Sequence, residues 1–219
     1  TSVMVDKDVA YCGAGLFPAQ GTVVVALDAK TGKQAWRNAQ AKKKYNVTLA
    51  PSGYLLASAE QVYVPNGRTV PLTYARSDGA LRGSMQNSYD IVAGKGLVSG
   101  DYGVLVDDIF YLGTQNVLHG YKPDGKHAEY WHDTRQLVAT SNRYVRMTGP
   151  SPAKARGVVA QPNGVSAIDR AAYDAGGRKR PVPKAVVQWN YARENLQTII
   201  VAGPHVVVGG ANEVLALDL

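Results

Sequence analysis

Short apolar runs, separated by turns rich in glycine, proline, asparagine, aspartate and serine, recur along the whole chain. Representative runs occupy residues 23–27, 62–64, 110–112 and 206–208. No stretch shows the spacing of apolar positions that predicts an amphipathic helix. Runs of this length between turn residues are typical of β-strands, so the pattern predicts short antiparallel strands joined by tight turns.

One strand-and-turn phrase returns at a nearly constant interval, and its first copy extends from Val23 to Trp36. The copies align on Asp28, Ala75, Tyr121, Asp169 and Asp218, at intervals of 47, 46, 48 and 49 residues. Each period contains four short apolar runs, which predict a meander of four antiparallel strands. A four-stranded repeat of this length is typical of a β-propeller blade.

The sequence therefore predicts an all-β chain, a β-propeller with four four-stranded antiparallel blades and part of a fifth. We expect blades at about 1–38, 50–85, 97–133 and 136–191 and a partial blade at 197–219, all within one propeller region, 1–219. Propellers have about four to eight blades, which favours a fragment of a larger ring of about seven or eight. Two copies that complete one ring are an alternative. A closed four-blade ring is disfavoured because the remaining strands would have no place in it.

Two segments compete for the second strand of the fourth blade. Residues 137–146 resemble two strands joined by a turn, whereas residues 157–160 have the spacing that the repeat requires. One of them must be an insertion, and 149–152 is predicted to be the loop between them. A second insertion, 171–184, is expected to lengthen the turn before Trp189.

Ala26, Asp28, Thr31, Gly32 and Trp36 form the pattern Ala-x-Asp-x-x-Thr-Gly-x-x-x-Trp. The carboxylate of Asp28 can accept backbone N–H groups across the turn, and Gly32 can supply a positive φ. The pattern resembles the tryptophan-docking motif of PQQ-like (quinoprotein and BamB-type) β-propeller repeats. The resemblance implies a structural role, in which Trp36 packs against the neighbouring blade.

The motif is complete only once. The second copy has Gly83 where the tryptophan would fall, and the third copy places Trp131 two residues late. The fourth copy keeps Ala167 and Asp169 and reaches Trp189 after its insertion.

The resemblance implies a fold, whereas the activity must come from a site. The family includes quinoprotein dehydrogenases, which hold PQQ and Ca²⁺ on the propeller axis, and non-catalytic scaffolds such as BamB. Our leading hypothesis is a non-catalytic, cofactor-free binding or scaffold propeller that presents hairpin loops to a protein or polymeric partner. A fragment of a PQQ- and calcium-dependent dehydrogenase is the alternative, and a polysaccharide-binding module is a third. An extracytoplasmic location, in the periplasm or cell envelope, follows from the resemblance alone.

Residues that would support the dehydrogenase alternative do not form a motif. Cys12 is the only cysteine, so the adjacent-cysteine disulfide usual in quinoprotein alcohol dehydrogenases cannot form. Oxygen ligands suited to Ca²⁺ are available at Asp90, Asp101, Asp107, Asp108 and Asn116, but Asp107 and Asp108 read as a tight turn. The four histidines, His119, His127, His132 and His205, show no metal-binding spacing. We therefore predict neither a catalytic residue nor a metal site.

Four loops that follow second strands carry turn residues, at 65–68, 113–116, 162–164 and 209–212. These loops should lie at one common end of the ring, where their polar side chains could line a shared surface. Asn-Gly is also favourable turn chemistry. Arg68 and Gln115 are the candidate surface residues, because turn geometry does not require them.

The net charge of +7 raises the question of a nucleic-acid partner. The basic residues are scattered, apart from clusters at 42–44 and 178–180 that read as exposed loops. We therefore predict no nucleic-acid partner, with another anionic partner as the alternative. No apolar stretch approaches the roughly 18–20 residues of a transmembrane helix, so no transmembrane segment is predicted.

Overall fold

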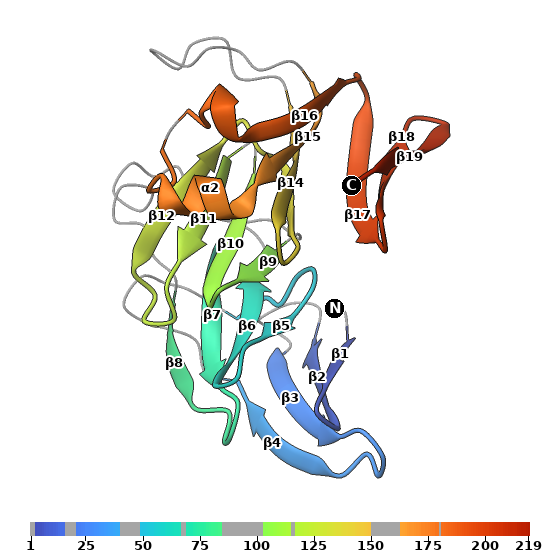
Figure 1. Ribbon diagram of the computed structural model, residues 1–219. Coiled ribbons are helices and arrows are strands. Elements are labelled where there is room, and N and C mark those ends of the chain that lie inside the picture. Colours follow the sequence, from blue (N-terminus) through green and yellow to red (C-terminus); the bar gives the residue numbers. More distant parts are fainter. Residues whose placement is uncertain are drawn as a thin grey trace. The chain divides into compact units, whose positions relative to one another are not determined.

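The computed structural model describes residues 3–15, 21–39, 49–66, 69–84, 103–114, 117–149, 163–179 and 181–219. In these residues the chain forms five antiparallel sheets, four with four strands and one with three (Figure 1). Within every sheet, strands that are neighbours in sequence are hydrogen-bonded neighbours in space. The predicted all-β chain of four whole blades and part of a fifth is therefore confirmed.

The first three sheets have four strands each. The first contains β1 (Val3–Asp6), β2 (Val9–Ala14), β3 (Val23–Asp28) and β4 (Gln34–Asn38). The second contains β5 (Leu56–Ala57), β6 (Gln61–Asn66), β7 (Thr69–Ala75) and β8 (Leu81–Ser84). The third contains β9 (Gly103–Val106), β10 (Ile109–Thr114), β11 (Val117–Tyr121) and β12 (His127–His132).

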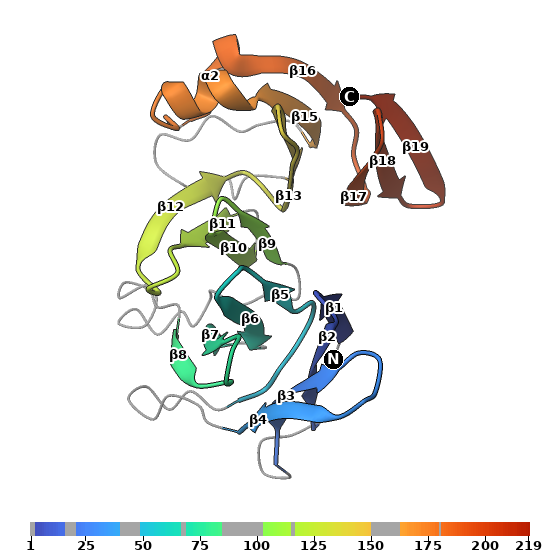
Figure 2. The ribbon, with the colours of Figure 1, turned by 60° about the horizontal axis from the view of Figure 1, so that its bottom comes forward.

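The last two sheets differ in strand number. The fourth contains β13 (Gln136–Ala139), β14 (Arg143–Thr148), β15 (Gly164–Asp169) and β16 (Val187–Ala192). The fifth contains β17 (Leu196–Ala202), β18 (His205–Gly210) and β19 (Glu213–Asp218), which Figure 2 shows side by side. Between β15 and β16 lie the short helices α2 (Arg170–Ala175) and η3 (Lys184–Val186).

The second strand of the fourth sheet is β14, which pairs with β13 on one side and β15 on the other. The interpretation of 137–146 as two strands joined by a turn is confirmed. The repeat spacing that pointed to 157–160, which lies outside the described residues, was misleading. The physical reason is that β14 contributes two fully buried apolar residues, Val145 and Met147, to the core.

The insertion expected at 171–184 contains all of α2 except its first residue, and the start of η3. The expectation that helices are absent is therefore wrong at this point. Asp169 caps α2 by accepting a hydrogen bond from the backbone N–H of Ala172 (2.8 Å). A helix of six residues is too short to reveal its periodicity in the sequence.

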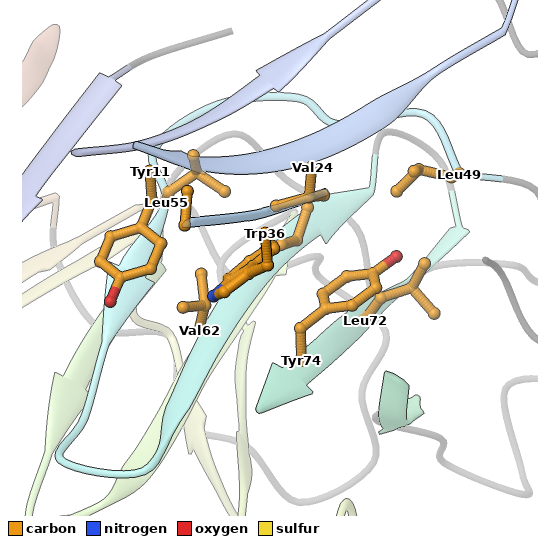
Figure 3. Close-up of a cluster of buried hydrophobic side chains, with 10 residues drawn as sticks. Tyr11, Val24, Trp36, Leu49, Leu55, Val62, Leu72 and Tyr74 are labelled. Carbon is orange, nitrogen blue, oxygen red and sulfur yellow. The ribbon is translucent and has the colours of Figure 1, made fainter. Parts of the chain in front are cut away.

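The chain forms two compact units, Thr1–Thr114 with His119–Tyr130, and Gln115–Leu118 with Trp131–Leu219. In the first unit, residues of the first and second sheets and of the segment between them form one buried cluster, drawn in Figure 3, that includes Tyr11, Val24, Trp36, Leu49, Leu55, Val62, Leu72 and Tyr74. In the second unit, residues of the fourth and fifth sheets form another, with Val145, Met147, Val165, Leu196, Ile199, Val206 and Val208. Each unit therefore has an apolar core shared between adjacent sheets.

Candidate functional site

The side chain of Trp36 joins the first sheet to the second (Figure 3). It lies on β4 opposite Ala26 of β3, and only 7% of it is exposed. Its indole N–H donates to the backbone carbonyl of Arg76 (3.0 Å), in the turn between β7 and β8. A Cβ placed on Gly79 of the same turn would overlap the indole ring. The tryptophan of the motif thus contacts the next sheet through a hydrogen bond and a close fit against glycine.

The other motif residues build the turn between β3 and β4. One carboxylate oxygen of Asp28 accepts hydrogen bonds from the backbone N–H of Thr31 (2.7 Å), its hydroxyl (2.7 Å) and the backbone N–H of Lys30 (3.1 Å). These bonds, chiefly those from Thr31, hold the pKa of Asp28 below its ordinary value of 3.8. Gly32 has φ +70°, the left-handed conformation that glycine adopts without strain. The turn is exposed and contributes no buried apolar surface. The hydrogen bonds of Asp28 and the left-handed conformation of Gly32 therefore serve to order its backbone.

Strand register relates the incomplete copies to the complete one. Trp36 lies opposite Ala26 with a bulge after it, and Trp189 lies opposite Ala167 with a bulge at the same place. In the second sheet the equivalent pair is Thr73 and Gly83. Gly83 therefore occupies the tryptophan position, as the sequence alignment predicted.

The remaining tryptophan, Trp131 at the end of β12, is buried in the second unit. Its ring contacts Tyr144 of β14 and Tyr173 of α2, with ring centroids 5.3 and 5.1 Å apart. Trp36 and Trp131 both contact the segment that joins the third and fourth strands of the following sheet. Trp36 thus contacts the second sheet, and Trp131 packs against α2 within the second unit.

Arg76 is a further contact between the first and second sheets that the sequence did not reveal. Its guanidinium donates to the hydroxyl of Tyr11 (3.0 Å) and to the carbonyls of Ser58 (2.9 Å) and Asp6 (3.1 Å). It also forms an ion pair with the Asp6 carboxylate. An arginine in a turn gives no sequence signal for such contacts, because they depend on tertiary packing.

A hollow with a volume of about 670 Å³ lies in the second unit. It is lined by Asn163, by residues 192–195 between β16 and β17, and by residues 211–213 between β18 and β19. Two of the loops predicted to share one end of the ring, 162–164 and 209–212, thus contribute to one surface. The sequence analysis missed residues 192–195, because this connection carries no distinctive turn motif.

Polar and apolar atoms both line the hollow, and its side chains carry charges of both signs. Arg193 and Glu213 form a two-point ion pair across it, with N–O distances of 3.0 and 2.7 Å. Both side chains are partly exposed, so this pair fixes geometry more than it stabilises the fold. Glu194, Asn195 and Asn212 are exposed around it. An open hollow with amides and carboxylates suits hydrogen bonding to a polar partner.

A second, smaller cavity of about 180 Å³ adjoins the hollow, and both are lined by Asn163 and Ala192. Its lining includes Arg146 and Thr148 of β14 and Asn190 of β16. Arg146 is buried, with 5% of the residue exposed. Sequence reasoning gave no reason to single out this arginine, because strand alternation does not show whether a charged position is covered.

The candidate surface residues Arg68 and Gln115 lie outside the described residues. Two residues before Arg68, Asn66 is fully buried, and its side-chain oxygen accepts from the backbone N–H of Ala50 (2.5 Å). At this loop the asparagine therefore supports the backbone. The exposed amides on the hollow belong to other loops.

The residues considered as oxygen ligands for calcium fall into two groups. Asp90, Asp101 and Asn116 lie outside the described residues. Asp107 and Asp108 form the two-residue turn between β9 and β10, with φ +49° and +61°, which confirms the turn interpretation. Among the residues that the structure describes, no three His, Cys, Asp or Glu side chains gather as metal ligands would.

The histidines also do not form a metal centre in the described ranges. His119 and His127 pack in an aromatic group with Tyr130, with ring centroids 6.1 Å apart between the two histidines. His205 lies 3.3 Å from the carboxylate of Asp218 at the far end of the fifth sheet. In the same ranges, no helix has the length and apolar character needed to cross a membrane.

Known structures give the decisive comparison. The chain is similar to BamB from Moraxella catarrhalis, with TM-score 0.52 and 16% identity, over 99% of this chain and 70% of that one. It is also similar to a quinohemoprotein alcohol dehydrogenase from Comamonas testosteroni, with TM-score 0.60 and 14% identity. This chain has the fold of a BamB-type and quinoprotein β-propeller.

The fold that the motif around Trp36 implied is thereby confirmed. The match to the dehydrogenase covers 99% of this chain but only 41% of the dehydrogenase. No protein-family model matches the sequence, and no curated protein matches it. The structural likeness at these identities shows the fold, and the activity is argued from the site.

Proposed function

We propose that this chain is a binding or scaffold β-propeller without catalytic activity, which recognises a protein partner through the loops around the 670 Å³ hollow. The observation that carries the proposal is the composition of this surface. Loops from the fourth and fifth sheets meet there, and they present amides, carboxylates and one arginine to solvent. Loops held by a rigid β-scaffold are the usual carriers of binding residues.

The likeness to BamB supports a protein partner and an extracytoplasmic location, in the periplasm or cell envelope. A polymeric partner such as a polysaccharide is the competing ligand for the same surface. The quinoprotein alternative requires PQQ and Ca²⁺. Titrating both into the full chain tests separately whether the chain binds this cofactor. Saturable binding of PQQ would overturn the cofactor-free proposal.

The direct test compares partner capture by variants of the hollow. Glu194→Arg reverses one exposed charge in it, and Ala211→Trp fills it with a bulky ring. Both residues are exposed, so neither change should affect folding. We expect each variant to recover at least about tenfold less partner from extracts of the source cells, a loss of about 1.4 kcal/mol.

The matched control is Lys184→Glu, an exposed charge reversal at the opposite end of the fourth sheet. It should leave the capture unchanged. Undiminished capture by both hollow variants would contradict the proposal. Capture of polysaccharide in place of protein would show that the partner is a polysaccharide.

A further inference from the structure

Arg146 holds an unusual position for a charged side chain. It lies in the middle of the fourth sheet, where register places it directly opposite Ser166 of β15, and Ser166 opposite Asn190 of β16. The three side chains therefore form a polar row across three strands. Ser166 is buried like Arg146, whereas Asn190 is exposed at the outer strand, so the row leads from the interior of the sheet to solvent.

The charge of Arg146 is only partly compensated. Its Nε donates to the hydroxyl oxygen of Ser166 (3.0 Å). Within the ranges that the structure describes, no carboxylate forms an ion pair with it, although Asp133 and Tyr173 lie within electrostatic reach. Burial is the largest influence on the pKa of Arg146 and lowers it. Tyr173 and Asp133 raise this pKa, but by less than burial lowers it. Removing an arginine from water without a paired anion costs several kcal/mol.

The guanidinium lines the 180 Å³ cavity beside the larger hollow. One water occupies about 30 Å³ in the liquid, so the cavity has room for a small polar group. Asn163 and Asn190 also line it, and their amides carry N–H donors. The hydroxyl of Thr148 is directed elsewhere, because it donates to the carbonyl of Gly164 (3.2 Å). The cavity thus combines one cation with neutral donors.

We propose that this cavity binds a carboxylate group, held by the guanidinium of Arg146 and by the amides of Asn163 and Asn190. A carboxylate carries a single negative charge, which matches one arginine. A phosphate carries close to two, and the residues that line the cavity include no second cation to match the second charge. The inference goes beyond the proposed function, because a free carboxylate can bind here whether or not the larger hollow recognises a partner.

The test is a titration of the full chain with sodium acetate, followed by ¹H–¹⁵N spectra at constant ionic strength maintained with NaCl. We expect the Nε resonance of Arg146 and the side-chain amide of Asn190 to shift together and to saturate. No saturable shift with acetate, or an equal response to phosphate, would overturn the proposal.

Two variants assign the binding to the cavity. Arg146→Gln should weaken acetate binding by about 10- to 100-fold, because hydrogen bonds to charged groups contribute about 1.5–3 kcal/mol. Asn190→Ala changes an exposed residue, should not affect folding, and should weaken binding by about 3- to 10-fold. Gln188→Ala is the matched control, since Gln188 is exposed on the same face of β16 but does not line the cavity. Equal affinities for Asn190→Ala and Gln188→Ala would contradict the proposal.

Two further probes identify the source of the carboxylate. Capped glutamate presents an acidic side chain, and capped glutamine is its uncharged match. Tighter binding of capped glutamate than of acetate would assign the cavity to an acidic side chain of a protein. Binding of acetate alone would assign it to a small free carboxylate, and binding of capped glutamine as strong as that of glutamate would overturn the proposal.

Discussion

Two glycines at the second sheet have opposite surroundings. Gly79 has φ +71°, and a Cβ there would overlap the indole of Trp36. At Gly83 the nearest atom to such a Cβ is the hydroxyl oxygen of Thr73, 3.9 Å away. We expect Gly79→Ala to lower the free energy of unfolding by about 2–4 kcal/mol, from the left-handed backbone and the overpacking. Gly83→Ala should be neutral or should stabilise by about 0.5–1 kcal/mol.

Urea denaturation followed by tryptophan fluorescence measures both changes. Because the two glycines are close in sequence and receive the same substitution, effects on the unfolded chain largely cancel. A similar loss of stability in the two variants would show that the indole of Trp36 does not pack against Gly79.

At the residue scale, the sequence revealed local chemistry and missed chemistry that depends on packing. The Asp28 turn was predictable because its hydrogen bonds join residues at most three apart. Arg76 and Arg146 were not, because their partners Tyr11 and Ser166 are 65 and 20 residues distant. Only the pairing of strands and sheets brings such residues together.

At the scale of elements, Asp169 carries a prediction about α2. It holds the same place in the repeat as Asp28, but it caps a helix where Asp28 orders a turn. We expect Asp169→Ala to destabilise the protein by about 1 kcal/mol, because the N–H of Ala172 loses its acceptor. Hydrogen exchange of the Ala172 amide should accelerate in this variant.

The control is Asp169→Asn, which removes the charge but keeps an oxygen that can accept from Ala172. Its exchange rate should stay close to that of the original protein. Equal acceleration in both variants would show that the charge of Asp169, and not its capping hydrogen bond, stabilises α2.

The elements themselves show where sequence patterns are sufficient. Strands such as β3 and β18 were predictable because apolar runs and turn residues are local signals. The second strand of the fourth sheet was ambiguous, since spacing cannot tell whether 143–148 or 157–160 pairs with β15. The pairing of Arg143 through Thr148 with β15 resolved it. Val145 and Met147 are buried in the core, and their burial stabilises this pairing.

At the scale of the whole molecule, the candidate site was predictable in part. Topology alone implied that the loops at 162–164 and 209–212 lie at the same end of their sheets, and both contribute to the hollow. The contribution of residues 192–195 and the adjoining cavity at Arg146 required coordinates. A cavity depends on what side chains leave unfilled, which no strand pattern contains.

The division into two units leads to a prediction about cooperativity. Val62 belongs to the core of the first unit and Val206 to that of the second, and both are fully buried. Replacing either by alanine should cost about 2 kcal/mol through lost burial and the cavity left behind. Because neither core contains residues of the other, Val62→Ala should accelerate hydrogen exchange in β6 and β7 and leave β18 unchanged. Val206→Ala should do the reverse. If either variant accelerates exchange in both units equally, the two units unfold together and this prediction is contradicted.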